Sequence, residues 1–196
     1  SLEFDAAELH IKSVSLANGT PLKYSHEDSK LRIYLNTPLN VGDEATLVIA
    51  YEGSPRRGLY FNVPDAGYPD RPKQVWTQGE DEDSRYWFPC YDFPNERLTS
   101  EVIVTVPHGW VAISNGRLHS AKENRAGKTY HWIQDKPHSS YLMSLVAGEY
   151  TEIREEWNGI PVIYYSPPGR EADTRRAFGK TPKMVQFFSE KIGVPY

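Results

Sequence analysis

Residues 76–94 read Trp-Thr-Gln-Gly-Glu-Asp-Glu-Asp-Ser-Arg-Tyr-Trp-Phe-Pro-Cys-Tyr-Asp-Phe-Pro, and this stretch joins an acidic run directly to an aromatic one. The carboxylates at positions 80–83 favour water or a cation, whereas the rings at positions 86–88 favour burial. A solvated loop rarely continues straight into such an apolar segment. The stretch is therefore where a functional site is expected, and the segments on either side of it define the fold.

Short segments of alternating apolar and polar residues, rich in Val, Ile, Tyr and Thr, extend on both sides of this stretch, from about residue 8 to residue 165. A period of two is typical of strands with one buried face, and turn residues such as Asn18-Gly19 separate the segments. We predict a mainly β fold, a saddle-like or sandwich-like domain of antiparallel or mixed sheet. The predicted strands are residues 9–14, 31–35, 46–51, 101–106, 110–113, 130–133, 141–146 and 161–165.

The pattern changes after Pro167-Pro168-Gly169, where apolar residues recur at three- and four-residue intervals. This spacing predicts a helix whose apolar face is wide enough to contact two bodies. Pro182 either kinks this helix or opens a second one with Thr181 as its cap. We expect residues 1–166 to form an N-terminal β domain that lacks its first strands. Residues 167–196 are expected to be a linker and the first helix of a further, truncated domain.

The composition limits the classes of partner that the chain is expected to bind. Its 196 residues carry a formal net charge of -4 without a cluster of Lys and Arg, so no nucleic acid partner is expected. No apolar run approaches the roughly 18 residues that span a bilayer, so no membrane partner is expected. Cys90 is the only cysteine, which excludes an intrachain disulfide and a cysteine-based zinc site. A chain of this length is expected to bury roughly 70% of its unfolded surface.

The acidic run has two interpretations. It is either an ordinary solvated loop or, if extended, a segment in which Glu80 and Glu82 point to one side and share one cation. An ammonium group is the expected ligand. A calcium-binding loop is not expected, because Gly79 precedes the acidic residues instead of lying among them. Arg85 and Asp92 flank the aromatic run and are expected to form an ion pair that fixes the turn.

The six histidines show no metal-ligand spacing. The segment that starts at His26 begins like the zinc motif H-E-x-x-H, but Lys30 stands in place of the second histidine and the segment is predicted to be a hairpin turn. His131 and His138 are expected to be ordinary core or surface residues. Cys90, among aromatic residues, is predicted to be a small buried hydrophobic side chain rather than a nucleophile.

Several motifs together resemble a known family. Thr77-Gln78-Gly79-Glu80, followed by Ser84-Arg85 and by Phe88-Pro89-Cys90-Tyr91-Asp92, resembles the N-terminal domain signature of the aminopeptidase N family of zinc metallopeptidases, the gluzincin aminopeptidases. Residues 51–53, 111–116 and 141–148 resemble the strands and turns on either side of it in that family. Residues 187–196 resemble the start of its catalytic domain, so the resemblance covers nearly the whole chain.

The resemblance implies a saddle-like β domain that covers the active site of a thermolysin-like catalytic domain. Glu80 falls where the family binds the free α-amino group of the substrate, and Gln78 falls on a neighbouring position of the same pocket. Arg85, Pro89 and Asp92 would hold these contacts in place. The family's zinc ligands and catalytic residues lie in its catalytic domain, so this chain is expected to contain no catalytic residue, to bind no zinc and to be inactive alone.

The implied partners are peptide substrates with a free N-terminus and the missing catalytic domain. Two alternatives remain open. The chain could belong to a relative whose metal site has decayed and that serves only in assembly, which the presence or absence of H-E-x-x-H in the next ~150 residues would decide. A carbohydrate-binding β-sandwich is suggested by five Trp and thirteen Tyr, although burial in strands explains most of these rings.

Overall fold

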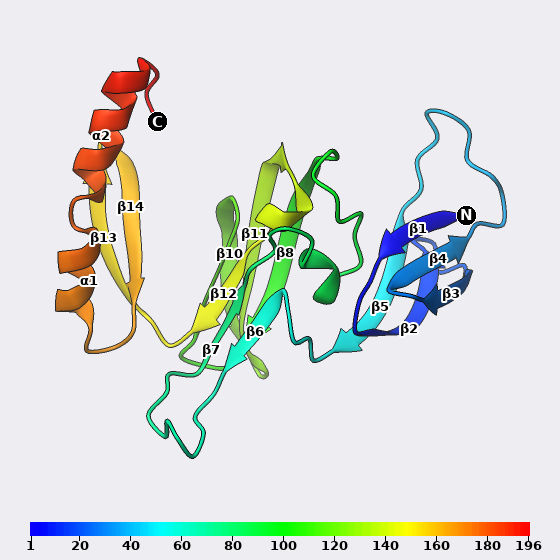
Figure 1. Ribbon diagram of the computed structural model, residues 1–196, viewed down its shortest axis with the longest axis horizontal. Coiled ribbons are helices and arrows are strands. Elements are labelled where there is room, and N and C mark those ends of the chain that lie inside the picture. Colours follow the sequence, from blue (N-terminus) through cyan, green and yellow to red (C-terminus); the bar gives the residue numbers. More distant parts are fainter.

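The computed structural model describes residues 1–196 and arranges them as three parts in a row (Figure 1). We call them the N-terminal unit (residues 2–53), the central unit (residues 59–148) and the C-terminal unit (residues 151–192). Strands account for 47% of the chain and helices for 13%, and every strand pair is antiparallel. The predicted mainly β fold is therefore confirmed.

The N-terminal unit brings two small sheets together around one core. Alternate residues of its strands point inward, because successive side chains of a strand lie on opposite faces. Its strands are β1 (Leu2–Asp5), β2 (Leu9–Leu16), β3 (Lys23–Glu27), β4 (Lys30–Tyr34) and β5 (Leu47–Gly53), ordered β1-β4-β3 in one sheet and β2-β5 in the other. The core consists of Ala6, Leu9, Ile11, Val14, Leu22, Leu31 and Ile33.

The central unit contains two further sheets and carries the acidic stretch. One sheet has the order β6-β7-β12-β9, from β6 (Leu59–Asn62), β7 (Gln74–Thr77), β9 (Val111–Ser114) and β12 (Leu145–Gly148). The other has the order β10-β11-β8, from β8 (Leu98–Val106), β10 (Arg117–Asn124) and β11 (Gly127–His138). Two 3-10 helices, η1 (Ser84–Tyr86) and η2 (Ser140–Leu142), complete the unit. Both sheets contribute to a small core of Val106, Ala112, Tyr130 and Ala147.

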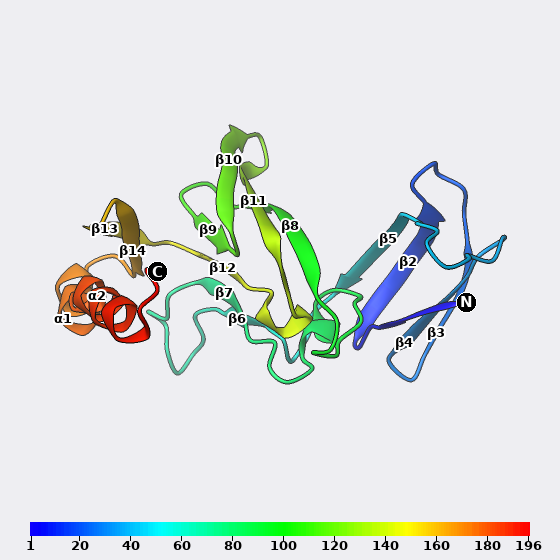
Figure 2. The same ribbon diagram turned by 90° about the horizontal axis from the view of Figure 1, so that it is seen from above.

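The C-terminal unit is a hairpin with two helices beside it (Figures 1 and 2). The hairpin joins β13 (Thr151–Trp157) to β14 (Ile160–Ser166), and the helices are α1 (Glu171–Phe178) and α2 (Thr181–Ile192). Helix α2 buries none of its side chains, and large apolar ones remain about half exposed or more: Met184, Phe187, Phe188 and Ile192. Neither helix is long and apolar enough to cross a membrane.

Two local predictions are wrong. Residues 141–146 do not form one strand, because η2 extends to Leu142 and β12 begins only at Leu145. Thr181 is the first residue of α2, not its cap, and Lys180 occupies the N-cap position. The Thr181 hydroxyl instead donates to the carbonyl oxygen of Phe178 (2.6 Å), which satisfies an acceptor left free where α1 ends. Of the two alternatives for Pro182, the structure shows the second helix.

Six strands lie outside the predicted strand ranges: β1, β3, β6, β7, β10 and β13. Polar strands give no alternation to detect, and β10 illustrates this, since almost all of its side chains are exposed. Such strands are recognised only by their partners, and β10 pairs along its length with β11. This segment is a strand because it pairs with β11, whose pattern of apolar residues is clearer, and not because it buries a face of its own.

The chain is less compact than its length suggests. Its accessible surface is 13098 Å², whereas a compact monomer of 22.4 kDa exposes roughly 9,400 Å². Folding therefore buries about 60% of the surface of the unfolded chain, and the expected 70% is wrong. The reason is the division into three units, each with a small core or none.

Candidate functional site

The acidic run lies in a tight loop between β7 and η1. Residues 80–83 form a turn in which the N–H of Asp83 donates to the carbonyl oxygen of Gly79 (2.9 Å), and the Glu80–Asp81 peptide bond is cis. The extended conformation considered for this run is therefore wrong. Glu80 and Glu82 do not share a face through strand alternation, so a role for each carboxylate has to come from its own contacts.

The four carboxylates of the loop differ in their partners. Glu82 forms an ion pair with Arg85, and Asp83 lies 3.8 Å from a guanidinium nitrogen of Arg57. Glu80 and Asp81 are exposed and form no ion pair within the chain. Two of the four charges are thus compensated internally, and the other two remain available to a ligand.

The two free carboxylates face a pocket of about 330 Å³. Two segments of the stretch 76–94 meet Tyr141 around it. The lining residues are Glu80, Asp81, Glu82, Phe93, Pro94 and Tyr141. A pocket lined by acidic groups and by two aromatic rings suits a cationic group attached to an apolar or aromatic side chain.

Gln78 is not among the residues that line this pocket. Its side chain is exposed, and its backbone N–H donates to the carbonyl oxygen of Gly58 (3.0 Å). The structure thus places Glu80 at the pocket and Gln78 just before it, so the role of Gln78 stays a prediction.

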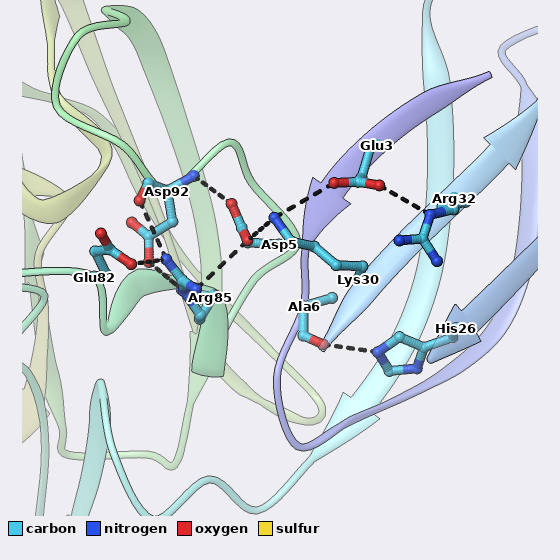
Figure 3. Close-up of polar contacts among 9 residues, drawn as sticks. All are labelled: Glu3, Asp5, Ala6, His26, Lys30, Arg32, Glu82, Arg85 and Asp92. Atoms are coloured by element: carbon cyan, nitrogen blue, oxygen red, sulfur yellow. Dashed lines mark hydrogen bonds and ion pairs between the residues drawn. The ribbon is translucent and has the colours of Figure 1, made fainter. Parts of the chain in front are cut away.

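Behind the loop, Arg85 and Asp92 form the predicted ion pair (Figure 3). One oxygen of Asp92, Oδ2, accepts hydrogen bonds from the backbone N–H (3.0 Å) and the Nε (3.2 Å) of Arg85. The Asp92 side chain is fully buried, whereas that of Arg85 is 20% exposed and also pairs with Glu82 and Asp5. Arg85 therefore fixes η1, the acidic turn and the segment at Asp92 relative to one another.

Asp5, at the end of β1, connects this ion-pair cluster to the N-terminal unit (Figure 3). Its Oδ1 accepts a hydrogen bond from Lys30 Nζ (2.7 Å), and its Oδ2 accepts one from the backbone N–H of Asp92 (3.1 Å). Asp5 and Cys90 also exchange two backbone hydrogen bonds, of 2.6 and 3.0 Å. The pocket is therefore held against the N-terminal unit through a nearly buried carboxylate.

A pH dependence of stability follows from Asp5. Burial alone would raise the pKa of its carboxyl group, but the hydrogen bonds from Lys30 and from the Asp92 N–H, with the charges of Arg85 and Lys30, lower the pKa below the ordinary 3.8. A carboxyl group whose pKa is lowered by folding stabilises the fold above its ordinary pKa, and this stabilisation is lost as the pH falls through the lowered value.

We expect Asp5→Asn to be destabilising at neutral pH and much less so in acid. Urea unfolding of both proteins at about pH 6 and about pH 3 measures the difference in unfolding free energy, which should shrink at the lower pH. A difference that is the same at both pH values would contradict this role of the Asp5 charge.

Cys90 is buried next to the half-buried Pro89. The Cys90 side chain is 4% exposed, and burial, together with the charges of Asp92 and Asp5, raises the pKa of the thiol. The prediction of a buried side chain is confirmed, and a neutral thiol is a poor nucleophile. Pro89 is half-buried between η1 and the backbone pair of Cys90.

The residues of this chain do not fit a zinc ion. No three side chains among its His, Cys, Asp and Glu residues are placed to hold a metal. His26 lies in β3, beside the predicted hairpin turn at Asp28-Ser29. Its Nε2 donates to the carbonyl oxygen of Ala6 (2.7 Å; Figure 3), so it serves a structural hydrogen bond.

The fold of this chain is similar to that of two solved zinc metallopeptidase mutants. A mutant M1 zinc metallopeptidase from Deinococcus radiodurans bound to a Tyr-Ser-Ala substrate superimposes with a TM-score of 0.74 at 22% identity, over 100% of this chain and 46% of that one. A two-domain M1 zinc metallopeptidase mutant bound to L-arginine gives a TM-score of 0.75 at 24% identity, again over 100% and 46%.

Sequence comparison gives the family. Residues 1–142 match the family model described as the Peptidase M1 N-terminal domain. Aminopeptidase N from Acetobacter pasteurianus is 30% identical over 195 residues, which cover 97% of this chain and 55% of that protein. Aminopeptidase M1-A from Oryza sativa subsp. japonica is 30% identical over 174 residues, which cover 87% of this chain and 20% of that protein. The chain belongs to the M1 peptidase family, and it spans about half of the first relative and less of the second.

Sequence reasoning missed several residues that build the site. Arg57, Asp5 and Tyr141 gave no local signal, because each acts through a residue at least ten positions away or through a pocket that only folding creates. Phe93 lies within the unusual stretch but was not singled out there. Asp5 is separated from Asp92 by 87 positions in the sequence. The residues that were found lie within the single stretch whose composition was unusual.

Proposed function

We propose that this chain is the substrate-binding N-terminal domain of a zinc-dependent aminopeptidase and that Glu80 binds the free α-amino group of peptide substrates. The observation that carries the proposal is the charge pattern of the loop. Glu80 lines the pocket without an internal cation, while its neighbours Glu82 and Asp83 are neutralised by Arg85 and Arg57. A charge-assisted hydrogen bond from an ammonium group to such a carboxylate is worth about 1.5–3 kcal/mol.

The rest of the enzyme would lie in a catalytic domain that follows this one. Zinc would be held there, since no residues of this chain fit it. The exposed apolar side chains of α2, among them Phe187 and Phe188, are proposed to contact that domain, with residues 167–196 as the connection. The role of this chain would be to fix the substrate's N-terminus and so determine which peptide bond reaches the metal. Arg85, Pro89 and Asp92 support the pocket, and Gln78 is proposed to assist at its entrance.

The test is the variant Glu80→Ala in the full-length protein. Loss of the ammonium contact should lower kcat/KM for an amino acid arylamide by roughly 10- to 100-fold. Glu27→Gln is the matched control, because Glu27 is also exposed and unpaired but lies on β3, and this variant should retain full activity. Equal kcat/KM for wild type and Glu80→Ala would exclude the role proposed for Glu80.

A further inference from the structure

Each chain segment that lines the pocket lies next to one of three buried polar residues. Ser84 lies two positions after the pocket residue Glu82. Asp92 immediately precedes the pocket residue Phe93, and Ser140 immediately precedes the pocket residue Tyr141. These three residues are 0%, 1% and 2% exposed. They come from three different parts of the central unit, so their contacts decide how the walls of the pocket are spaced.

Ser140 is bonded to both of the other residues. Its hydroxyl donates to Oδ1 of Asp92 (2.9 Å), and its carbonyl oxygen accepts a hydrogen bond from the hydroxyl of Ser84 (2.9 Å). The other carboxylate oxygen of Asp92 is occupied by Arg85. All of the polar groups in this chain of contacts are therefore satisfied, which is the condition under which a buried polar network is rigid.

The backbone is also closely packed where the two walls meet. A Cβ atom on Gly79 would lie 2.5 Å from the carbonyl oxygen of Tyr141 and 2.8 Å from Oγ of Ser84. Glycine is therefore required at position 79, and the residue before Glu80 lies directly against the backbone of Tyr141. A shift of Ser140 would move Tyr141, and through this contact it would move Glu80.

We infer that Ser140 is a positioning residue for the α-amino pocket and that it acts through Glu80. The inference rests on the proposed function, because it assigns to Ser140 the spacing between the Glu80 loop and Tyr141 in that same site. A carboxylate that receives an ammonium group has to be held within about 0.5 Å of its productive position. The hydroxyl of Ser140 acts on this position indirectly, because it ties the segment of Tyr141 to Asp92.

A double-mutant cycle with Glu80 tests this assignment in the full-length enzyme. Ser140→Ala should raise KM for an amino acid arylamide by roughly 3- to 10-fold, the effect of one lost hydrogen bond. In a Glu80→Ala background the same substitution should change KM by less than about 2-fold, because a residue that acts through Glu80 has nothing left to position. Ser84→Ala, which removes the other bond, should behave in the same way.

The control is Ser166→Ala in the C-terminal unit. Ser166 is 0% exposed and its hydroxyl accepts a hydrogen bond from Thr174 (2.7 Å), so its loss tests the effect of removing any buried hydroxyl, and KM should stay at the wild-type value. Equal effects of Ser140→Ala with and without Glu80 would overturn the inference and leave the proposed function intact. If Glu80→Ala itself does not change kcat/KM or KM, both the inference about Ser140 and the role proposed for Glu80 are wrong.

Discussion

Asp92→Ala is expected to lower the free energy of unfolding by about 3 kcal/mol. Three hydrogen-bond donors lose their acceptor in this variant: the Arg85 backbone N–H, its Nε and the Ser140 hydroxyl. Breaking a buried ion pair typically costs about 3–5 kcal/mol, and the lower end applies because Arg85 keeps Asp5 and Glu82 as partners. Urea unfolding of the purified chain measures the loss.

The matched control for Asp92 is Glu52→Gln. Glu52 also forms an ion pair, with Lys12, but the two side chains are 60% and 50% exposed, and exposed pairs contribute about 0–1 kcal/mol. Comparable losses for both variants would show that burial of Asp92 adds nothing, contrary to the structure. A small loss for Glu52→Gln beside a large one for Asp92→Ala is the expected pattern.

Gly58→Ala is expected to cost about 2–6 kcal/mol and to disturb the acidic loop. Gly58 has a φ of +74°, in the left-handed region, and a Cβ atom there would overlap the carbonyl oxygen of Asp83. Left-handed strain costs about 1–3 kcal/mol in a residue other than glycine, and overpacking adds a similar amount. Because Asp83 closes the turn on Gly79, relief of the overlap should displace Glu80 and lower kcat/KM in the full-length enzyme.

Gly19→Ala separates strain from overlap. Gly19 has a φ of +86° but no atom within 4 Å of the position of a Cβ. This variant should therefore show only the backbone strain, about 1–3 kcal/mol, with unchanged kinetics. If Gly58→Ala is no more destabilising than Gly19→Ala, the contact between Gly58 and Asp83 does not constrain the loop.

The sequence predicts the fold class well where strands have one buried face. Leu9 and Ile11 lie two positions apart in β2 and both are in a core, so their spacing reports their burial directly. Val14 is also in the core, three positions further on, because the register of β2 shifts between Ile11 and Ser13. The segment at Tyr141 was wrongly predicted to be a strand because its apolar residues surround a 3-10 turn. A short apolar run does not distinguish a strand from a helical turn. The division into three units is not visible in any local pattern.

The site is predicted less completely. Glu80, Arg85 and Asp92 are identified because unusual composition and family resemblance converge on one stretch. Ser140 is not, since a serine before an aromatic residue is common and the role inferred for it comes from hydrogen bonds with Asp92 and Ser84, 48 and 56 positions away. The conformation of the acidic run is also missed, because a turn and an extended segment have the same composition.

The backbone pair between Asp5 and Cys90 places the Cys90 thiol where its reactivity can report contact between the N-terminal and central units. Cys90 is the only thiol, it is almost fully buried, and it lies where the N-terminal unit meets the central unit. A nearby contact between the same two units is the bond from the Tyr51 hydroxyl to the carbonyl oxygen of Trp87 (3.0 Å). Alkylation of the native protein therefore measures how often these units separate, without the introduction of any label.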